Sequence, residues 1–185
     1  MALPLPKSYA PMNALLVDDI PVGDQWQYEP KWDGFRCIAF RDGASIDLQS
    51  KNGQPLSRYF PEMVESLAHL SAKRFVLDGE LVIPQGRALS FDALLQRIHP
   101  AATRIRRLSE QTPAIYIVFD LLVYESGASL VDRPLRERRR ALEAFASKHL
   151  RGNDRITLSP VADDIRTARR WFSGVVTAPI SPLAK

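Results

Sequence analysis

The stretch YEPKWDGFR, residues 28–36, places a lysine, a carboxylate, a glycine and an arginine directly before an apolar run. Lys31 can act as a nucleophile if desolvation or neighbouring cations remove the proton from its ammonium group. Asp33 can orient that amine or accept its proton, and Gly34 permits close backbone approach. Arg36 offers a planar fork for phosphate or ribose oxygens. The residues alone leave two interpretations open, a nucleophilic site or a strand end with a surface Lys–Asp pair.

Apolar patterning predicts strands and helices on both sides of this stretch. We expect strands at residues 26–31, 35–41, 45–50, 75–83, 114–124 and 155–159, and helices at 59–70, 90–98, 134–149 and 163–172. Asp42-Gly43 indicates a hairpin, because glycine accepts the positive φ of such turns. Ser90 is expected to cap its helix. The run at 75–83 is a strand pair or one bent strand, and 114–124 is a central strand.

The order of these elements favours an α+β fold. Neither G-x-G-x-x-G nor G-x-x-x-x-G-K-[ST] occurs in the sequence, so Rossmann and P-loop folds lose their main support. We therefore expect antiparallel β-sheets flanked by helices. Residues 1–25 contain several prolines and are expected to lie on the domain as an irregular arm.

Bulk composition is that of one soluble domain. A chain of 185 residues buries roughly 70% of its unfolded surface. The single cysteine, Cys37, excludes an internal disulfide and lies in an apolar stretch, so we expect a core residue. No apolar run approaches the roughly 20 residues of a membrane span. The first residues do not resemble a signal peptide, which predicts a cytoplasmic protein without membrane contact.

Two runs of arginine contribute to the formal net charge of +4. They contain Arg97, Arg104, Arg106 and Arg107, and Arg136, Arg138, Arg139 and Arg140. Phosphate contacts with a nucleic acid are one interpretation of these runs. Solvated helix faces are the other, and the sequence alone leaves both open.

Residues 31–34, Lys-Trp-Asp-Gly, match the K-x-D-G motif of the covalent nucleotidyltransferase superfamily, which includes DNA ligases, RNA ligases and mRNA capping enzymes. The surrounding stretch most closely resembles the adenylation domain of bacterial ATP-dependent DNA ligases, especially the end-joining repair type. The resemblance runs from Pro11 to Phe172. It implies the DNA ligase/mRNA capping enzyme nucleotidyltransferase fold, which is ATP-grasp-like.

Three further segments resemble motifs of this family and follow its order. Residues 50–53, Ser-Lys-Asn-Gly, resemble the second motif, in which the basic residue contacts phosphate. Lys51 stands where arginine is usual, which keeps the charge but loses the fork. Residues 76–82 resemble the third motif, which implies that Glu80 binds the AMP ribose and helps to place a metal ion. Asp78 is expected to support the local backbone.

The last of these segments, residues 116–122, resembles the motif whose aromatic residue stacks on adenine. That resemblance assigns the stacking role to Phe119, which would otherwise be read as a core residue. It also implies that Glu29 reads the adenine end of the nucleotide and that Arg36 contacts the nucleotide. Without the family, Glu29 would be an ordinary surface carboxylate.

The resemblance implies a three-step reaction. Lys31 attacks the α-phosphate of ATP to form Lys–AMP, AMP passes to a DNA 5′-phosphate, and a 3′-hydroxyl then seals the nick. Mg²⁺ or Mn²⁺ is the expected metal, held mainly by substrate phosphates. The expected partners are nicked double-stranded DNA and other end-joining repair proteins. The resemblance also implies a monomer associated with the bacterial nucleoid.

The C-terminal sequence departs from the family pattern. Ser173 stands where a metal-binding carboxylate is usual and Ala178 where a lysine is usual, and the later Lys-x-Lys pair has no counterpart. We therefore expect residues 1–185 to be a C-terminally incomplete adenylation domain without an OB-fold domain. Electrostatic groups of this kind are often worth a hundredfold or more in rate. A non-catalytic nucleotide- or DNA-binding module remains an alternative, as does an RNA ligase or capping-type enzyme.

Overall fold

The computed structural model describes residues 2–13, 18–86 and 88–173. The strands are β1 (Phe35–Asp42), β2 (Ser45–Ser50), β3 (Arg74–Val82), β4 (Pro84–Gln85), β5 (Ala88–Leu89), β6 (Ile115–Val123) and β7 (Ile156–Leu158). The helices are the 3-10 helix η1 (Ser57–Tyr59), α1 (Pro61–His69), α2 (Phe91–Arg97), α3 (Ala102–Gln111), α4 (Leu135–His149) and α5 (Ile165–Ser173). None of the helices in these ranges is long and apolar enough to cross a membrane.

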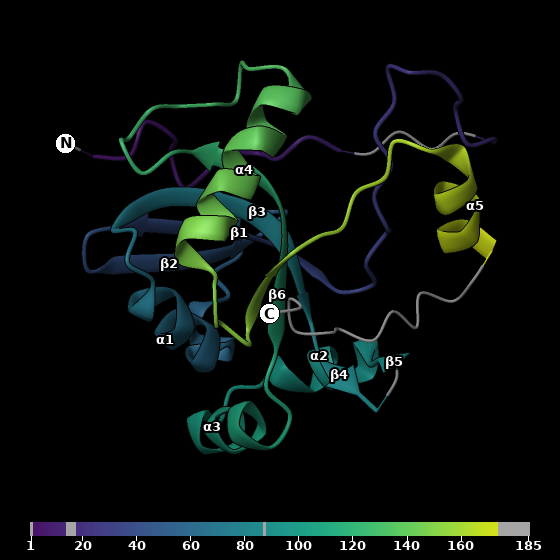
Figure 1. Ribbon diagram of the computed structural model, residues 1–185. Helices are drawn as coiled ribbons and strands as arrows, with labels where there is room; N and C mark the ends of the chain where they lie inside the picture. Colours follow the sequence, from purple (N-terminus) through teal and green to yellow (C-terminus); the bar gives the residue numbers. More distant parts are fainter. Residues whose placement is uncertain (1, 14–17, 87, 174–185) are drawn as a thin grey trace.

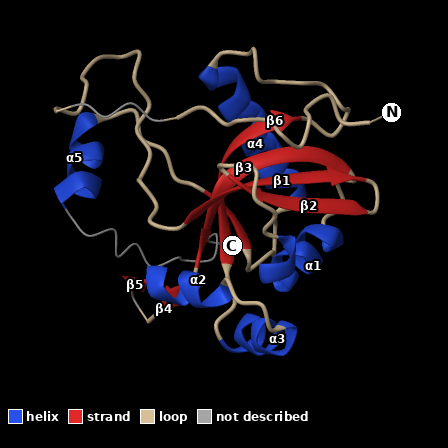
Figure 2. Cartoon of the chain, turned by 180° about the vertical axis from the view of Figure 1, so that it is seen from behind, coloured by secondary structure: helices blue, strands red, loops and turns tan. Residues whose placement is uncertain are grey.

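One five-stranded sheet with the order β2-β1-β3-β6-β7 organises the fold. The pairs β2–β1, β1–β3 and β3–β6 are antiparallel, whereas β7 runs parallel to β6. The parallel pair departs from the antiparallel expectation because α4 lies in the connection from β6 to β7, and such a crossover returns the chain in the same direction. Figures 1 and 2 show α5 apart from the sheet, beside the loop that precedes β1.

The β1–β2 hairpin confirms the turn predicted at Asp42-Gly43. Asp42 pairs with Ser45, and Gly43 is the first of the two loop residues, with φ of +62°. Side chains other than glycine rarely adopt this backbone conformation, so the glycine permits the tight connection.

One face of the sheet is covered by α1 and α4 and is called here the helix-covered face. Ala39, Leu77 and Val118 of the sheet share a buried apolar cluster with Leu67 of α1 and Phe145 of α4. Cys37 belongs to the same cluster, which confirms its predicted core role. Burial of this apolar surface is the main force that holds the helices on the sheet.

The opposite face is covered by the N-terminal arm and is called the arm-covered face. Here Ile38, Val76 and Leu122 pack with Leu3 and Tyr9, which confirms that the first residues lie on the domain. The apolar cluster on this face is smaller than the one beneath the helices, so part of the sheet is left for polar side chains.

A β-bulge in β6 directs two consecutive side chains onto the arm-covered face. Asp120 and Val118 pair with consecutive residues of β3, which leaves Phe119 as an extra residue in β6. Val118 and Leu121 both pack on the helix-covered side. Phe119 and Asp120 between them therefore face the other way. Bulges of this kind often re-aim side chains beside active sites.

Several sequence predictions require correction. The strand predicted at residues 26–31 is wrong: the segment contributes only an isolated bridge between Tyr28 and Ala162. Pro30 removes a backbone donor there, which explains why no longer ladder forms. Residues 75–83 form one strand, β3, and the helix predicted at 59–70 is divided into η1 and α1 at Phe60. Ser90 caps α2 as predicted, because its Oγ accepts a hydrogen bond from the Ala93 N–H.

The helix α3 was missed by the sequence patterning. Its ten residues include few apolar side chains, and only Ile105 and Ser109 among them are buried. A helix that exposes most of its surface gives a weak apolar period. Arg106 and Arg107 are exposed on it, as a solvated helix face requires.

Arg97 is buried rather than available to a nucleic acid. Its Nη2 donates to both carboxylate oxygens of Glu62 at 2.7 Å and to the Tyr59 carbonyl at 2.9 Å. Nη1 donates to the Thr112 carbonyl, and the guanidinium lies 4.9 Å from the ring centroid of Phe60. Neither interpretation from the sequence fits Arg97, which is an internal cross-link between α2 and α1.

Candidate active site

Lys31 lies in the loop that leads into β1, and its side chain is 88% exposed. Its Nζ donates a hydrogen bond of 3.1 Å to Oδ1 of Asp33. The structure therefore shows the Lys–Asp pair inferred from the sequence, with an exposed rather than a desolvated amine. A nucleotide that covered Lys31 would have to supply the desolvation.

Gly34 fixes this loop against β3. A Cβ at this position would lie 2.2 Å from the Leu81 carbonyl oxygen and 2.9 Å from Cγ of Glu80, so no larger residue fits without a shift. The Gly34 backbone N–H also donates to the Glu80 carboxylate. The glycine thus brings the loop that carries Lys31 next to Glu80.

Glu80 is the most strongly perturbed carboxyl group of this face. Burial raises its pKa to about 7, and the nearby Asp78 carboxylate acts in the same direction. The Gly34 N–H and the charges of Arg36 and Lys31 lower the pKa and offset part of that rise. A carboxyl group that titrates near neutral pH beside a lysine is a common feature of catalytic and binding sites.

Arg36 joins β1, β3 and the N-terminal arm. Its Nε and Nη2 donate to the two carboxylate oxygens of Asp78 at 3.1 and 2.7 Å, and its Nη1 donates to the Met12 carbonyl at 2.8 Å. The guanidinium also lies over the Phe119 ring, 5.4 Å from its centroid. Arg36 therefore occupies one side of the ring that was predicted to stack on adenine.

Asp78 forms an ion pair with Arg36 and accepts a hydrogen bond from its own strand backbone. Burial raises the pKa of its carboxyl group, and the hydrogen bond from Arg36 partly offsets this. The Gly79 backbone N–H donates to the same carboxylate, in line with the expected support of the local backbone. The ion pair with Arg36 was not foreseen, although Arg36 pairs with Glu80 across the strands and Asp78 lies one pair further along the same face.

Glu29 lies at the other side of the Lys31 loop. Its Oε1 accepts a 2.8 Å hydrogen bond from Gln27 Nε2 and lies 3.9 Å from Nη1 of Arg139. Burial raises the pKa of the Glu29 carboxyl group, while Arg139 lowers it. Trp32 ties the loop to β7, because its Nε1 donates to Ser159 Oγ at 3.0 Å.

A cavity of about 420 Å³ opens beside Lys31. Glu29 and Lys31 line it from the loop, and Ala168, Trp171 and Phe172 line it from α5. Its size lies within the range of small-molecule sites. The α5 wall is apolar, and the loop wall adds two charged side chains, Glu29 and Lys31. The helix α5 thus lies beside the predicted nucleophile, a placement that the sequence did not indicate.

Three other positions singled out from the sequence are located only through neighbouring residues or lie outside the description. Lys51 is exposed and follows Ser50, which pairs with Cys37, so it lies at the same end of the sheet as Arg36. Ser173 is the last residue of α5, and its side chain lies outside what the structure describes. Ala178 also lies outside the described residues.

The second arginine run is divided between core and surface. Arg138 Nε donates to both carboxylate oxygens of Asp120 at 3.0 Å, and Arg139 is also buried. Arg136 and Arg140 are exposed. The sequence reading missed the two inward arginines. A signal was present, because they stand four and three residues before Leu142, on the apolar side of α4.

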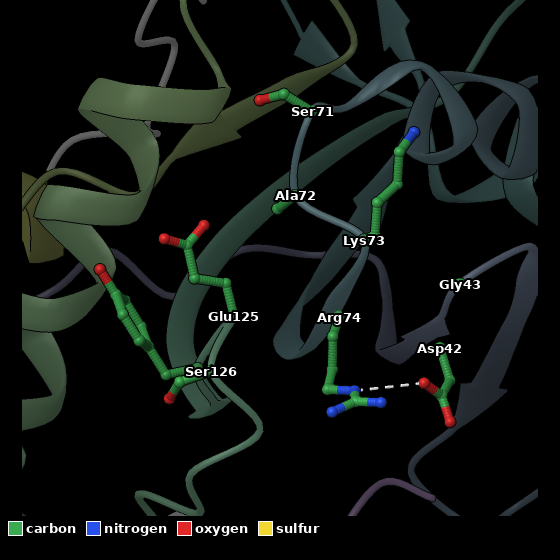
Figure 3. A pocket seen from close by; sticks show the side chains of 9 residues that line it. Asp42, Gly43, Ser71, Ala72, Lys73, Arg74, Glu125 and Ser126 are labelled. Carbon is green, nitrogen blue, oxygen red and sulfur yellow. Dashed lines mark hydrogen bonds and ion pairs between the residues drawn. The ribbon is translucent and has the colours of Figure 1, made fainter. Parts of the chain in front are cut away.

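A larger cavity, about 570 Å³, lies at the opposite end of β1. Figure 3 shows its lining, with Arg74 donating to Asp42 at 3.2 Å beside the β1–β2 turn and Glu125 on the other side. Eight residues of β1 separate the two ends, roughly 25 Å of strand. This cavity is therefore remote from the residues that were predicted to bind a nucleotide.

Metal binding by protein side chains alone has little support in the described ranges. They contain no group of three or more histidine, cysteine, aspartate or glutamate side chains placed to hold an ion. A single half-buried carboxylate such as Glu80 does suit Mg²⁺ that is held mainly by phosphate oxygens.

Comparison with known proteins gives the family. The sequence profile of the ATP dependent DNA ligase domain matches residues 11–180. DNA ligase C2 of Mycolicibacterium smegmatis is 43% identical over 188 aligned positions, which cover 97% of this chain and 51% of the relative. DNA ligase C of Mycobacterium tuberculosis is 44% identical over 174 residues, 94% of this chain and 48% of the relative. The chain thus spans about half the length of these curated relatives.

Two further likenesses are more distant. The multifunctional non-homologous end joining protein LigD of Pseudomonas aeruginosa is 35% identical over 144 residues, 77% of this chain and 16% of that protein. A solved mycobacterial DNA ligase D, complexed with ATP and MES, superposes with a TM-score of 0.56 at 23% identity over 80% of this chain and 45% of that chain. The last likeness confirms the predicted nucleotidyltransferase fold. By the profile and the curated relatives, the chain belongs to the ATP-dependent DNA ligase domain family.

Proposed function

We propose that residues 1–185 form an adenylation domain in which Lys31 becomes covalently attached to AMP. The observation that carries the proposal is the contact of Gly34 with β3, which brings the loop that carries Lys31 next to Glu80. Lys31 itself lines the 420 Å³ cavity. Membership of the ligase family supports ATP as the nucleotide.

In the proposed reaction, the Lys31 amine forms an N–P bond with the α-phosphate of ATP. The bond from that phosphorus to the bridging oxygen breaks, and pyrophosphate leaves with the electron pair. The ammonium loses one proton to become the attacking amine, and Asp33, 3.1 Å away, is the carboxylate placed to accept it. The nitrogen releases a second proton to solvent once the N–P bond has formed. A nucleotide that covers the exposed Lys31 would lower the pKa of its ammonium group by desolvation.

The surrounding side chains suit the parts of ATP. We assign adenine stacking to Phe119 and base reading to Glu29. Glu80 would contact the ribose, and Arg36 and Lys51 the phosphates or ribose oxygens. Arg36 now pairs with Asp78 and lies over Phe119, so base stacking on that side would require it to move.

We assign Glu80 as the protein ligand of a Mg²⁺ or Mn²⁺ ion. Phosphate oxygens of the nucleotide would supply further ligands. When bound, the ion would neutralise charge on the phosphates. A nearby cation would also favour the ionised form of Glu80, because burial raises the pKa of this carboxyl group to about 7.

We further propose that the AMP is destined for the 5′-phosphate of a nicked double-stranded DNA, in an end-joining repair setting. The names of the relatives support this, including one that is named for non-homologous end joining. Exposed Arg106 and Arg107, and Arg136 and Arg140 on α4, are the members of the two arginine runs that remain suited to phosphate contacts.

A non-catalytic nucleotide-binding module is a second candidate, favoured by the 88% exposure of Lys31. The mass of the intact chain after incubation with ATP and Mg²⁺ separates the two. An AMP adduct that is absent from Lys31→Ala supports the adenylation domain. ATP binding without an adduct in the parent chain supports the module and overturns the proposed reaction.

A further inference from the structure

Arg139 is a buried cation whose hydrogen bonding is incomplete. Its side chain is 7% exposed. Nε donates to Glu143 Oε1 at 2.8 Å, and Nη2 donates to the Ser159 carbonyl at 2.9 Å. Among the residues that the structure describes, Nη1 is buried and has no hydrogen-bond partner. Oε1 of Glu29 lies 3.9 Å from this nitrogen.

This contrasts with Arg97, whose side chain is fully buried. Arg97 donates from Nε, Nη1 and Nη2, and its main partner is one carboxylate at 2.7 Å. An unpaired buried donor is costly, and groups of this kind in folded proteins usually have a reason. The spare N–H of Arg139 faces the carboxylate that lines the cavity beside Lys31.

The two carboxylate oxygens of Glu29 have different contacts. Among the described residues, both Gln27 Nε2 and Arg139 Nη1 approach Oε1. Oε2 is therefore the oxygen available to a ligand in the cavity. An ionised carboxylate only accepts hydrogen bonds. Adenine presents an amino donor at its six-position, whereas guanine presents an oxygen acceptor there.

We propose that Arg139 is a positioning residue for base selection, which holds Oε1 of Glu29 so that Oε2 accepts the adenine amino group and rejects guanine. The inference rests on the proposed function for the role of Glu29. Arg139 acts through Glu29 and does not touch the nucleotide. Arg139 also donates to the Ser159 carbonyl, and Ser159 Oγ accepts a hydrogen bond from Trp32 of the Lys31 loop. Arg139 is therefore connected both to Glu29 and to the loop that carries the proposed nucleophile.

Removal of the Arg139 charge has a definite consequence for selectivity. Burial already disfavours the ionised form of Glu29, and Arg139 is the cation that opposes this. With methionine at position 139, the carboxyl group would hold its proton more often. A protonated carboxyl group can donate to the guanine oxygen. Arg139→Met should therefore reduce the ratio of ATP affinity to GTP affinity, rather than weaken the binding of both nucleotides equally.

The test measures dissociation constants for ATP and GTP by calorimetry in the Lys31→Ala background, where no adduct can form. Arg139→Met should weaken ATP binding about tenfold or more and reduce the ATP:GTP preference by a similar factor. Arg151→Met, at an exposed arginine just after the end of α4, is the matched control and should change neither. Arg139→Lys keeps the charge and should restore part of the preference.

Glu29→Gln supplies the coupling test. If Arg139 acts through Glu29, adding Arg139→Met to Glu29→Gln should change the preference little further. Equal weakening of ATP and GTP by Arg139→Met, or additive effects of the two changes, would overturn the inference. If Arg139→Met does not fold, as shown by thermal unfolding without nucleotide, Arg139→Lys is measured alone and combined with Glu29→Gln, and carries the same test.

The proposed reaction is judged separately, by the adduct on the parent chain. An Arg139-dependent preference for ATP without an adduct would support base selection and refute the chemistry. An adduct that forms with the same ATP:GTP preference in the parent and in Arg139→Met would support the chemistry and refute the role of Arg139 in base selection. Binding of neither nucleotide would overturn both.

Discussion

The two faces of the central sheet satisfy their polar groups in different ways. The helix-covered face is almost wholly apolar, and two of the buried charges beside it, Arg97 and Glu62, bind each other at 2.7 Å. The arm-covered face carries Arg36, Asp78 and Glu80 next to a half-exposed Phe119. Asp78 is buried and pairs with Arg36, whereas Arg36 and Glu80 are partly exposed.

The difference separates residues that hold the fold from residues kept available to a ligand. A fully paired buried charge gains nothing from a ligand, and its loss damages stability. A carboxyl group with a pKa near 7, or a guanidinium that covers an aromatic ring, can exchange its partner when a ligand arrives. Substitution of the paired Arg97 should therefore act mainly on unfolding, and substitution of Glu80 or Phe119 mainly on nucleotide binding.

The largest expected effect is on the helix-covered side. Arg97→Met leaves Glu62 buried without its cation, which should cost about 3–5 kcal/mol of unfolding free energy. Urea denaturation measures it, with the exposed Arg106→Met as the control, expected within about 0.5 kcal/mol of the parent. ATP affinity of the folded fraction should not change. A loss below about 1 kcal/mol would show that the buried pair does not stabilise this face.

Gly34→Ala tests the junction of the Lys31 loop with the arm-covered face. The added Cβ would lie 2.2 Å from the Leu81 carbonyl oxygen, so the loop must move. Misplacement of a reactive group by about 1 Å can cost roughly a hundredfold in rate, and the rate of adduct formation should fall by about that factor.

Gly43→Ala is the matched control for this substitution. Its Cβ meets nothing within 4 Å, but its φ of +62° is strained for alanine. It should cost about 1 kcal/mol of stability and leave the adduct rate unchanged. Equal adduct rates in the two variants would contradict the proposed role of Gly34.

The contrast also explains what the sequence could predict. Most strands and helices followed from apolar period, because the helix-covered core imposes that period on β1, β3, β6 and α4. The exceptions were segments without such a face. Residues 26–31 carry an apolar pattern but meet the fold through one bridge, and α3 exposes most of its side chains.

The site residues were predictable only in part. Lys31, Glu80, Arg36 and Phe119 came from a motif pattern, and the structure brings them to one end of the sheet. The partners that tune them were not visible in the sequence. Arg139 is 110 positions from Glu29, and only the packing of α4 against the end of β7 brings them together.

Phe119→Ala should have an intermediate effect, on the arm-covered face alone. Loss of a stacking surface costs about 1–3 kcal/mol per base. The dissociation constant for ATP, measured by calorimetry in the Lys31→Ala background, should rise accordingly. Phe119→Tyr keeps the ring and should bind ATP much as the parent does. Unchanged affinity in Phe119→Ala would refute the assignment and leave Phe119 as a partner of Arg36 only.

The smallest expected effect is the pH dependence that Glu80 gives to stability. Its folded pKa of about 7 lies above the ordinary 4.5, so between these values the folded state binds more protons than the unfolded state. The stabilisation is fully present below about pH 4.5 and is lost as pH rises through about 7. Because Glu80 is partly exposed, we expect about 1 kcal/mol after allowing for solvent screening.

Glu80→Gln removes this titration while keeping a similar shape. The unfolding free energy of the parent, relative to the variant, should therefore fall by about 1 kcal/mol between pH 4.5 and pH 7.5. A difference that stays constant, or that rises with pH, would mean that the carboxyl group is not held in its neutral form. The charges of Arg36 and Lys31 would then outweigh burial at Glu80, and the arm-covered face would be as fully paired as the buried charges on the other side of the sheet.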